Sequence, residues 1–137
     1  MGFLTSLQEY GDWGLFILRL SIGIIFIYHG KMKWSMWKME PSEQMPAQML
    51  SLMKFLSIVE PLGGLALITG FLTQVAAVGL GVIMLGAINT KIKMMKVKFF
   101  MQDNTGWEFD FVLLFGCITL LLTGAGKIAL DGLLFGI

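Results

Sequence analysis

Two oppositely charged residues lie inside long apolar stretches of this sequence. Glu60 interrupts the apolar run of residues 50–72, and Arg19 interrupts the run of residues 13–30. An ionisable side chain inside a membrane span costs at least about 2.5–3.5 kcal/mol on insertion scales, so it is rarely retained for packing alone. The depths of the two residues differ little enough for an extended guanidinium to reach the carboxylate. The sequence therefore predicts an Arg19–Glu60 ion pair, which either serves a functional site or ties two helices together.

A proline next to Glu60 makes this part of the span more polar. Pro61 has no N–H, so the carbonyl of Ser57, four residues earlier, loses its helical partner and a kink is expected. Gly63 and Gly64 follow Glu60 at i+3 and i+4, where small residues let a neighbouring helix approach closely. We therefore expect Glu60 to point into a helix bundle.

Further polar residues lie at the ends of the apolar runs, in the same half of the membrane as Glu60. His29 ends the first run, Asn89 ends the third and Glu108 begins the fourth. Groups that exchange a proton near neutral pH suit quinone reduction, which takes up two protons, so His29, Glu60 and Glu108 are expected to line one pocket. With Lys33 and Trp107 at the rim, the candidate ligand-binding residues are Arg19, His29, Lys33, Glu60, Asn89, Trp107 and Glu108.

Some of these residues have a purely structural alternative. Glu108 lies three residues after Thr105, the spacing of a capping box in which its side chain bonds to the backbone at the helix start. His29 at the membrane interface could equally bond to a headgroup or a carbonyl, and a single histidine argues against haem ligation. Asp110 points away from Glu108 and is interpreted as a first-turn acid outside the pocket.

The fourth run has a small, polar face that we expect to turn toward the bundle interior. Gly116, Thr119 and Thr123 follow Glu108 at i+8, i+11 and i+15, close to whole helical turns. The eleven methionines of the chain are interpreted as adaptable apolar filler rather than a metal path, and no metal site is predicted.

Composition identifies the elements that must position these residues. The 137 residues are 56% hydrophobic and 14% charged, with a mean hydropathy of +0.79, which is too apolar for a soluble domain. Four apolar segments, at about residues 13–30, 47–72, 74–92 and 107–124, are long enough or nearly long enough to cross a bilayer. The sequence therefore predicts an all-α, four-helix transmembrane bundle that forms a single membrane domain over residues 1–137.

The lysines predict the orientation of that bundle. Those of two loops share one face, namely Lys31, Lys33, Lys38, Lys91, Lys93, Lys96 and Lys98, and oppose only Lys127. The positive-inside rule then places both termini outside. A net charge of +1 with lysines confined to loops argues against nucleic acid as a partner. Cys117 is the only cysteine, which excludes an internal disulfide and a C-x-x-C redox pair.

The order and spacing of several short motifs resemble the DoxX family of four-span membrane proteins. The motifs, which cover nearly the whole chain, are Leu18-Arg19-Leu20 with Gly23, Phe26 and His29-Gly30 through Lys33; Glu60 with Gly63 to Gly70; Gly106-Trp107-Glu108; and Gly124-Ala125-Gly126-Lys127 with Leu130-Asp131. The chain departs from the family pattern at Ala125, Ala129 and Gln74. The resemblance implies a four-span fold and, through some relatives, a link to quinone-dependent oxidoreductase complexes.

These observations lead to one main functional hypothesis and two alternatives. The main hypothesis is a quinone-binding membrane subunit of an oxidoreductase complex in the cell membrane, at most part of an enzyme because the chain encodes no electron carrier. The alternatives are a small proton-coupled transporter, for which no inverted repeat is visible, and a scaffold that anchors a soluble redox enzyme. The expected partners are the lipid bilayer, a redox partner protein and a second copy of the chain.

Overall fold

Four long helices form the body of the protein in a computed structural model that describes residues 2–136. They are α2 (Gly11–Met32), α3 (Ala47–Thr69), α4 (Thr73–Lys93) and α5 (Glu108–Thr123). The shorter elements are α1 (Gly2–Ser6), the 3-10 helices η1 (Leu7–Tyr10) and η2 (Lys33–Lys38), and α6 (Leu130–Phe135). The described residues contain helices and no strand, so the predicted all-α bundle is confirmed.

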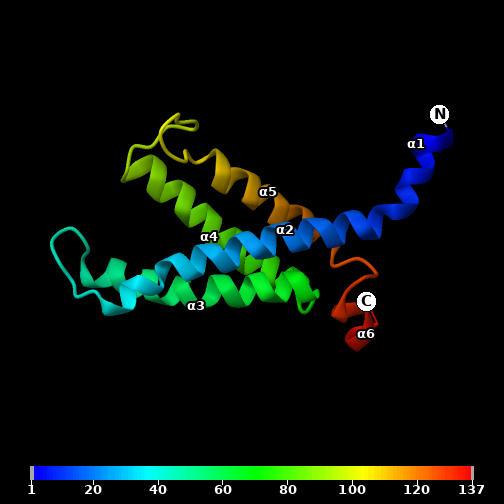
Figure 1. The fold of residues 1–137 in the computed structure, drawn as a ribbon, viewed down its shortest axis with the longest axis horizontal. Helices are drawn as coiled ribbons and strands as arrows, with labels where there is room; N and C mark the ends of the chain where they lie inside the picture. Colours follow the sequence, from blue (N-terminus) through cyan, green and yellow to red (C-terminus); the bar gives the residue numbers. More distant parts are fainter. Residues whose placement is uncertain (1, 137) are drawn as a thin grey trace.

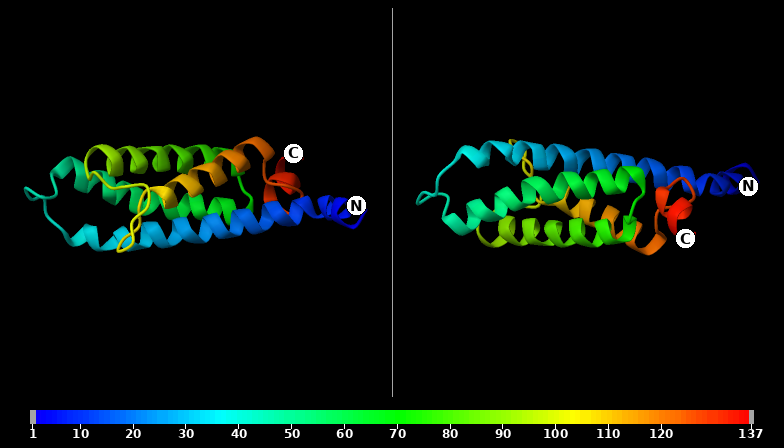
Figure 2. Two further views of the ribbon diagram at one scale, coloured as in Figure 1. Left: turned by 90° about the horizontal axis from the view of Figure 1, so that it is seen from above. Right: turned by 90° about the horizontal axis from the view of Figure 1, so that it is seen from below.

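The helices pair as two antiparallel hairpins. Helix α2 packs along α3 and α4 packs along α5, as Figure 1 and both views of Figure 2 show. Both termini lie at one end of the bundle, and the long loops 39–46 and 94–107 lie at the other. The two chain termini therefore lie at the same end of the bundle, as an even number of antiparallel helices requires.

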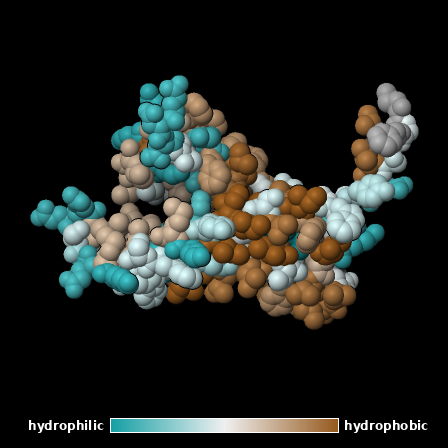
Figure 3. Space-filling view, viewed as in Figure 1, coloured by the Kyte–Doolittle hydropathy of each residue, from teal (hydrophilic) through white to brown (hydrophobic). Residues whose placement is uncertain are grey.

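Three helical stretches are long and apolar enough to cross a membrane. They cover Leu4–Lys38, Ala47–Thr69 and Thr73–Lys93. Helix α5 has 16 residues, a rise of about 24 Å at 1.5 Å per residue. Apolar side chains cover the middle of the bundle surface, and hydrophilic residues gather over the loops (Figure 3). The protein is an integral membrane protein.

Glycines bring α2 and α3 into backbone contact and fix their register. A Cβ atom added to Gly23 would lie 2.5 Å from the carbonyl oxygen of Gly64, and one added to Gly64 would lie 2.5 Å from that of Gly23. Nearer the loops, a Cβ on Gly30 would lie 2.2 Å from Cδ of Pro61. Pro61 thus packs against a residue without a side chain, as small-residue helix contacts in membranes require.

The C-terminal segment closes the turn between α3 and α4. Gly70 ends α3 with a φ of 67°, and Leu72 precedes α4 in the left-handed region with a φ of 48°. Asp131 of α6 accepts hydrogen bonds from the backbone N–H of Leu72 at 2.6 Å and of Thr73 at 2.9 Å. Its carboxylate therefore caps the N-terminus of α4 from a distant part of the chain.

One buried apolar cluster holds the two hairpins together. It contains Ile22, Phe26, Leu67, Ala77, Leu80, Met84, Leu113, Cys117 and Leu120. On α5 the buried face is therefore that of the large apolar residues, and Thr119 and Thr123 are exposed. Their hydroxyls donate to carbonyls one turn earlier in the same helix, at 2.9 and 2.8 Å, so they need no interhelical partner. The prediction that the small, polar face of this span turns inward is wrong for these threonines.

Candidate functional site

Glu60 pairs with Lys33 at the loop end of the α2–α3 hairpin. The Lys33 ammonium lies 2.5 Å from a Glu60 carboxylate oxygen, and it also donates to the backbone carbonyl of His29 at 3.2 Å. The Glu60 side chain is 2% exposed and that of Lys33 is 20% exposed. Burying the carboxylate is therefore compensated by a cation that extends down from η2.

The predicted Arg19–Glu60 ion pair is wrong. The fully buried Arg19 donates from Nη1 to the carbonyl of Leu67 at 3.2 Å and from Nη2 to the carbonyl of Ile128. Because Gly23 faces Gly64, Arg19 lies level with Leu67, seven residues along α3 from Glu60. Seven helical residues correspond to roughly 10 Å, too far for a direct pair.

Two tryptophans bind the polar site that the proline creates. The indole N–H of Trp34 donates to the carbonyl of Ser57 at 3.1 Å, and that of Trp37 donates to the Ser57 hydroxyl at 2.9 Å. The carbonyl that Pro61 leaves without a helical partner is thus satisfied by η2. The prediction of a freed acceptor was right, and its partner was not foreseen.

A second ion pair, between Lys91 and Asp110, joins the loop ends of α4 and α5. The Lys91 ammonium lies 2.6 Å from a carboxylate oxygen of Asp110, which is 4% exposed. The ammonium also donates to the carbonyl of Gly106 at 3.2 Å. Asp110 is therefore a first-turn acid of α5, as interpreted, and it also forms an ion pair that was not foreseen. The sequence did carry a signal for this pair. It places a lysine in the last turn of one span and an acid in the first turn of the next span, which runs antiparallel to it.

A cavity of about 310 Å³ lies beside this second pair. It is lined by His29, Lys91, Thr105, Phe109 and Asp110. The imidazole of His29 packs against the Phe109 ring with 5.5 Å between centroids. Helices α2, α4 and α5 and the loop before α5 therefore all contribute to this cavity.

His29 lies between the two ion pairs. Its imidazole is within electrostatic reach of Lys33, Glu60, Lys91 and Asp110. The two cations and the two carboxylates around the ring balance in formal charge. A ligand in the cavity would meet an imidazole, an ammonium and a carboxylate within one small volume.

The other predicted site residues lie outside this cavity. Of the three expected to line one pocket, His29 lines it, whereas Glu60 and Glu108 are not in its lining. No side chain caps α5, so the predicted capping box with Thr105 is not formed. The half-buried Glu108 carboxylate instead keeps one oxygen, Oε2, without a hydrogen bond among the described residues.

Trp107 and Asn89 occupy the edge of the lysine end. Trp107 packs edge-on against Phe99 with 4.5 Å between ring centroids, and Asn89 is exposed near the end of α4. In residues 2–136 no cluster of three or more His, Cys, Asp or Glu side chains is arranged to hold a metal ion.

Comparison with known proteins relates this arrangement to one family. The sequence profile of the DoxX family matches residues 14–92. A protein of Bacillus subtilis (strain 168) named "Putative oxidoreductase CatD" is 34% identical over 126 residues, which is 89% of this chain and 87% of that protein. No solved structure matches the chain. The profile covers more than half of the chain and the relative nearly all of it, and the protein belongs to the DoxX family.

Proposed function

We propose that this protein is the quinone-binding membrane subunit of an oxidoreductase, with the quinone head group in the cavity lined by His29, Lys91 and Asp110. The observation that carries the proposal is that proton-exchanging groups from three helices meet at this one cavity. Its volume of about 310 Å³ is at the lower end of the range for small-molecule sites, about 300–1,000 Å³. That size suits a single substituted ring.

The lining residues match the two oxidation states of such a ring. A quinone presents carbonyl oxygens that accept hydrogen bonds, and the Lys91 ammonium and a ring N–H of His29 are donors. On two-electron reduction the ring takes up two protons, which His29 and the Lys91–Asp110 pair are placed to supply. Phe109 provides an apolar wall against which the ring packs.

The electrons come from a partner in this proposal. Haem, flavin and iron–sulfur groups are the cofactor classes that could deliver them, and a partner subunit would hold the group. The similarity to a protein whose name calls it an oxidoreductase supports a redox role for this chain. The exposed loops at the lysine end are where such a partner would dock.

A titration of the purified chain tests the quinone site. A short-chain benzoquinone is added to the protein in detergent, and tryptophan fluorescence is followed to saturation. We expect His29→Ala and Asp110→Asn each to weaken binding roughly two- to tenfold, the equivalent of one hydrogen bond of about 0.5–1.5 kcal/mol. Tyr28→Ala, at a neighbouring residue that is 63% exposed, and Asp103→Asn, at an exposed loop acid, are the matched controls.

The outcomes of this titration separate the hypotheses. Saturable quenching that weakens only in the two cavity variants supports the quinone site. Quenching that never saturates, or an equal loss in Tyr28→Ala and Asp103→Asn, would refute it and favour the scaffold function.

The proposal also specifies how the chain lies in the cell membrane. Helix α5 is the fourth span, and the lysine loops face the cytoplasm with both termini outside. In intact cells a membrane-impermeant maleimide should label Leu134→Cys and not Ser35→Cys, because residue 134 follows the last span and residue 35 lies in η2. The native Cys117 is 1% exposed and should stay unlabelled. Labelling of residue 35 alone would reverse the orientation.

A further inference from the structure

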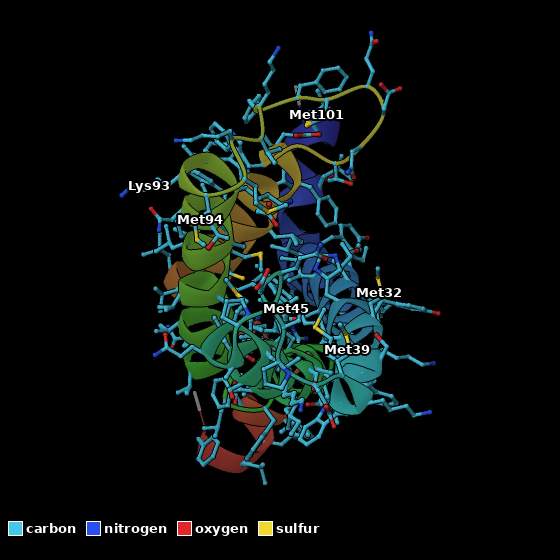
Figure 4. All side chains as sticks on the ribbon, turned by 90° about the vertical axis from the view of Figure 1, so that its left-hand side faces the viewer. Met32, Met39, Met45, Lys93, Met94 and Met101 are labelled. Atoms are coloured by element: carbon cyan, nitrogen blue, oxygen red, sulfur yellow. The ribbon has the colours of Figure 1, made fainter. Side chains whose placement is uncertain are left out.

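Three lysines lie at the loop end of α4, one in its last turn and two in the loop that follows, and the bundle does not use them. The side chains of Lys33 and Lys91 point inward and bind carboxylates. The side chains of Lys93, Lys96 and Lys98 are exposed, and none of them forms an ion pair with the carboxylates of the described residues. Figure 4 shows Lys93 directed outward from the end of α4. These three charges are therefore free to bind an external anion.

Exposed apolar side chains alternate with these lysines. Met94 is 67% exposed, Met95 63% and Phe100 65%, and Figure 4 shows Met94 and Met101 at the outer edge of the bundle. Cations and large apolar groups on one short segment suit the membrane interface, where phosphates lie directly above acyl chains. An aqueous surface would offer nothing to these apolar side chains.

The loop backbone is fixed against the start of α5. The N–H of Trp107 donates to the carbonyl of Lys98 at 3.4 Å, and the N–H of Glu108 donates to the carbonyl of Phe99 at 3.1 Å. These bonds place Lys98 beside the first turn of α5. The position of this charge relative to that helix is therefore set by the fold.

A row of aromatic rings continues from Lys98 down the outer face of α5. Phe99 packs against Trp107, Trp107 lies 6.1 Å from Phe111, and Phe111 lies 4.6 Å from Phe115, all between ring centroids. Phe111 is 38% exposed and Phe115 52% exposed. Because Trp107, which immediately precedes α5, and Phe111 and Phe115 within it are spaced by four, the three rings share one face that points away from the buried cluster. The row leads from the headgroup level into the hydrocarbon layer.

We propose that this surface is a binding site for an anionic phospholipid. The phosphate lies at Lys96 and Lys98, and an acyl chain lies along Phe111 and Phe115. Free phosphate shares the charge and lacks the chain, so the aromatic row selects a lipid over a soluble anion. The site is separate from the His29 cavity, because Asp110 turns inward from the same helix.

Lipid titration of the purified full-length protein tests this site. Dioleoyl phosphatidylglycerol and dioleoyl phosphatidylcholine are titrated separately into detergent-solubilised protein, and bound lipid is counted by native mass spectrometry. We expect preferential binding of the anionic lipid, weakened about fivefold for each of Lys96→Gln and Lys98→Gln. Lys31→Gln, at an exposed lysine in the last turn of α2, should leave it unchanged. Phe115→Ala should weaken binding of both lipids.

Each arm of the experiment can overturn the proposal. Equal binding of the two lipids would remove the anion site, and an equal loss in Lys31→Gln would show diffuse attraction to all lysines instead. Displacement of the lipid by inorganic phosphate at equal concentration would identify a soluble-anion site. Displacement by polyglutamate, with no effect of Phe115→Ala, would identify an acidic protein surface as the occupant.

Discussion

Removing one partner of the Lys33–Glu60 ion pair should destabilise the protein, and the two single changes should differ in cost. Lys33→Met leaves a carboxylate that is 2% exposed without its cation, so we expect a loss of about 3–5 kcal/mol in the free energy of unfolding. Glu60→Gln leaves an ammonium that is 20% exposed and still bonded to the carbonyl of His29. Its loss should be smaller, about 1–3 kcal/mol, the value of one charged hydrogen bond.

The double variant measures the interaction itself. At 2.5 Å the attraction is about 7 kcal/mol with an effective dielectric constant near 20, before the cost of desolvation. Lys33→Met with Glu60→Gln should therefore cost less than the sum of the single changes, by a coupling energy of about 1–3 kcal/mol. The matched control combines Arg19→Gln with Glu60→Gln, since these residues are separated by seven residues of helix register and bind different partners.

Equilibrium unfolding in mixed detergent and dodecyl sulfate micelles, followed by circular dichroism, provides the free energies. The control cycle should be additive within about 0.5 kcal/mol. Additive losses for Lys33 and Glu60 would contradict the ion pair, and coupling between Arg19 and Glu60 would restore the pair that the sequence predicts. A larger loss for Glu60→Gln than for Lys33→Met would refute the argument from burial.

Two further changes test the packing and the cap of the bundle by the same measurement. Gly64→Ala should lower the free energy of unfolding by about 1–3 kcal/mol, because its methyl group would lie 2.5 Å from the carbonyl oxygen of Gly23. Gly79→Ala is the control: no heavy atom lies within 4 Å of the new methyl group, so this change should be neutral or stabilising. Asp131→Asn keeps one acceptor for the two N–H groups at the start of α4, so it should cost about 1–3 kcal/mol, while Asp103→Asn on the exposed loop should cost nothing measurable.

The helices were predictable because the bilayer sets their length. Predicted spans at about residues 13–30, 47–72, 74–92 and 107–124 correspond to α2, α3, α4 and α5. An apolar run long enough to cross about 30 Å of hydrocarbon must satisfy its backbone internally, so the run itself identifies the helix. The depth of each polar residue follows from its place in the run, which is why His29 was assigned to the correct end.

The ion-pair partner of each buried charge was not predictable, because it depends on how neighbouring helices are shifted along and rotated about their axes. The contact of Gly23 with Gly64 fixes α2 against α3 and moves Arg19 out of reach of Glu60. The orientation of α5 depends on which of its two faces packs against the rest of the bundle. Its threonines do not decide this, because their hydroxyls donate to carbonyls of the same helix. Neither quantity is encoded in the order of apolar and polar residues along a single span.

The two ends of the bundle use their buried charges differently, and this difference indicates where chemistry is available. Arg19 is bound to backbone carbonyls and Asp131 to backbone N–H groups, partners that do not titrate. An arginine stays charged in a protein, so the bonds of Arg19 to these carbonyls hold α2 against α3 and the C-terminal segment. At the lysine end, each buried carboxylate is held by a lysine that is partly exposed, and His29 lies between the pairs beside a cavity. Because both carboxylates there are already paired with cations, a ligand bound in the cavity meets a group whose formal charges balance, and its binding leaves no uncompensated charge in the membrane.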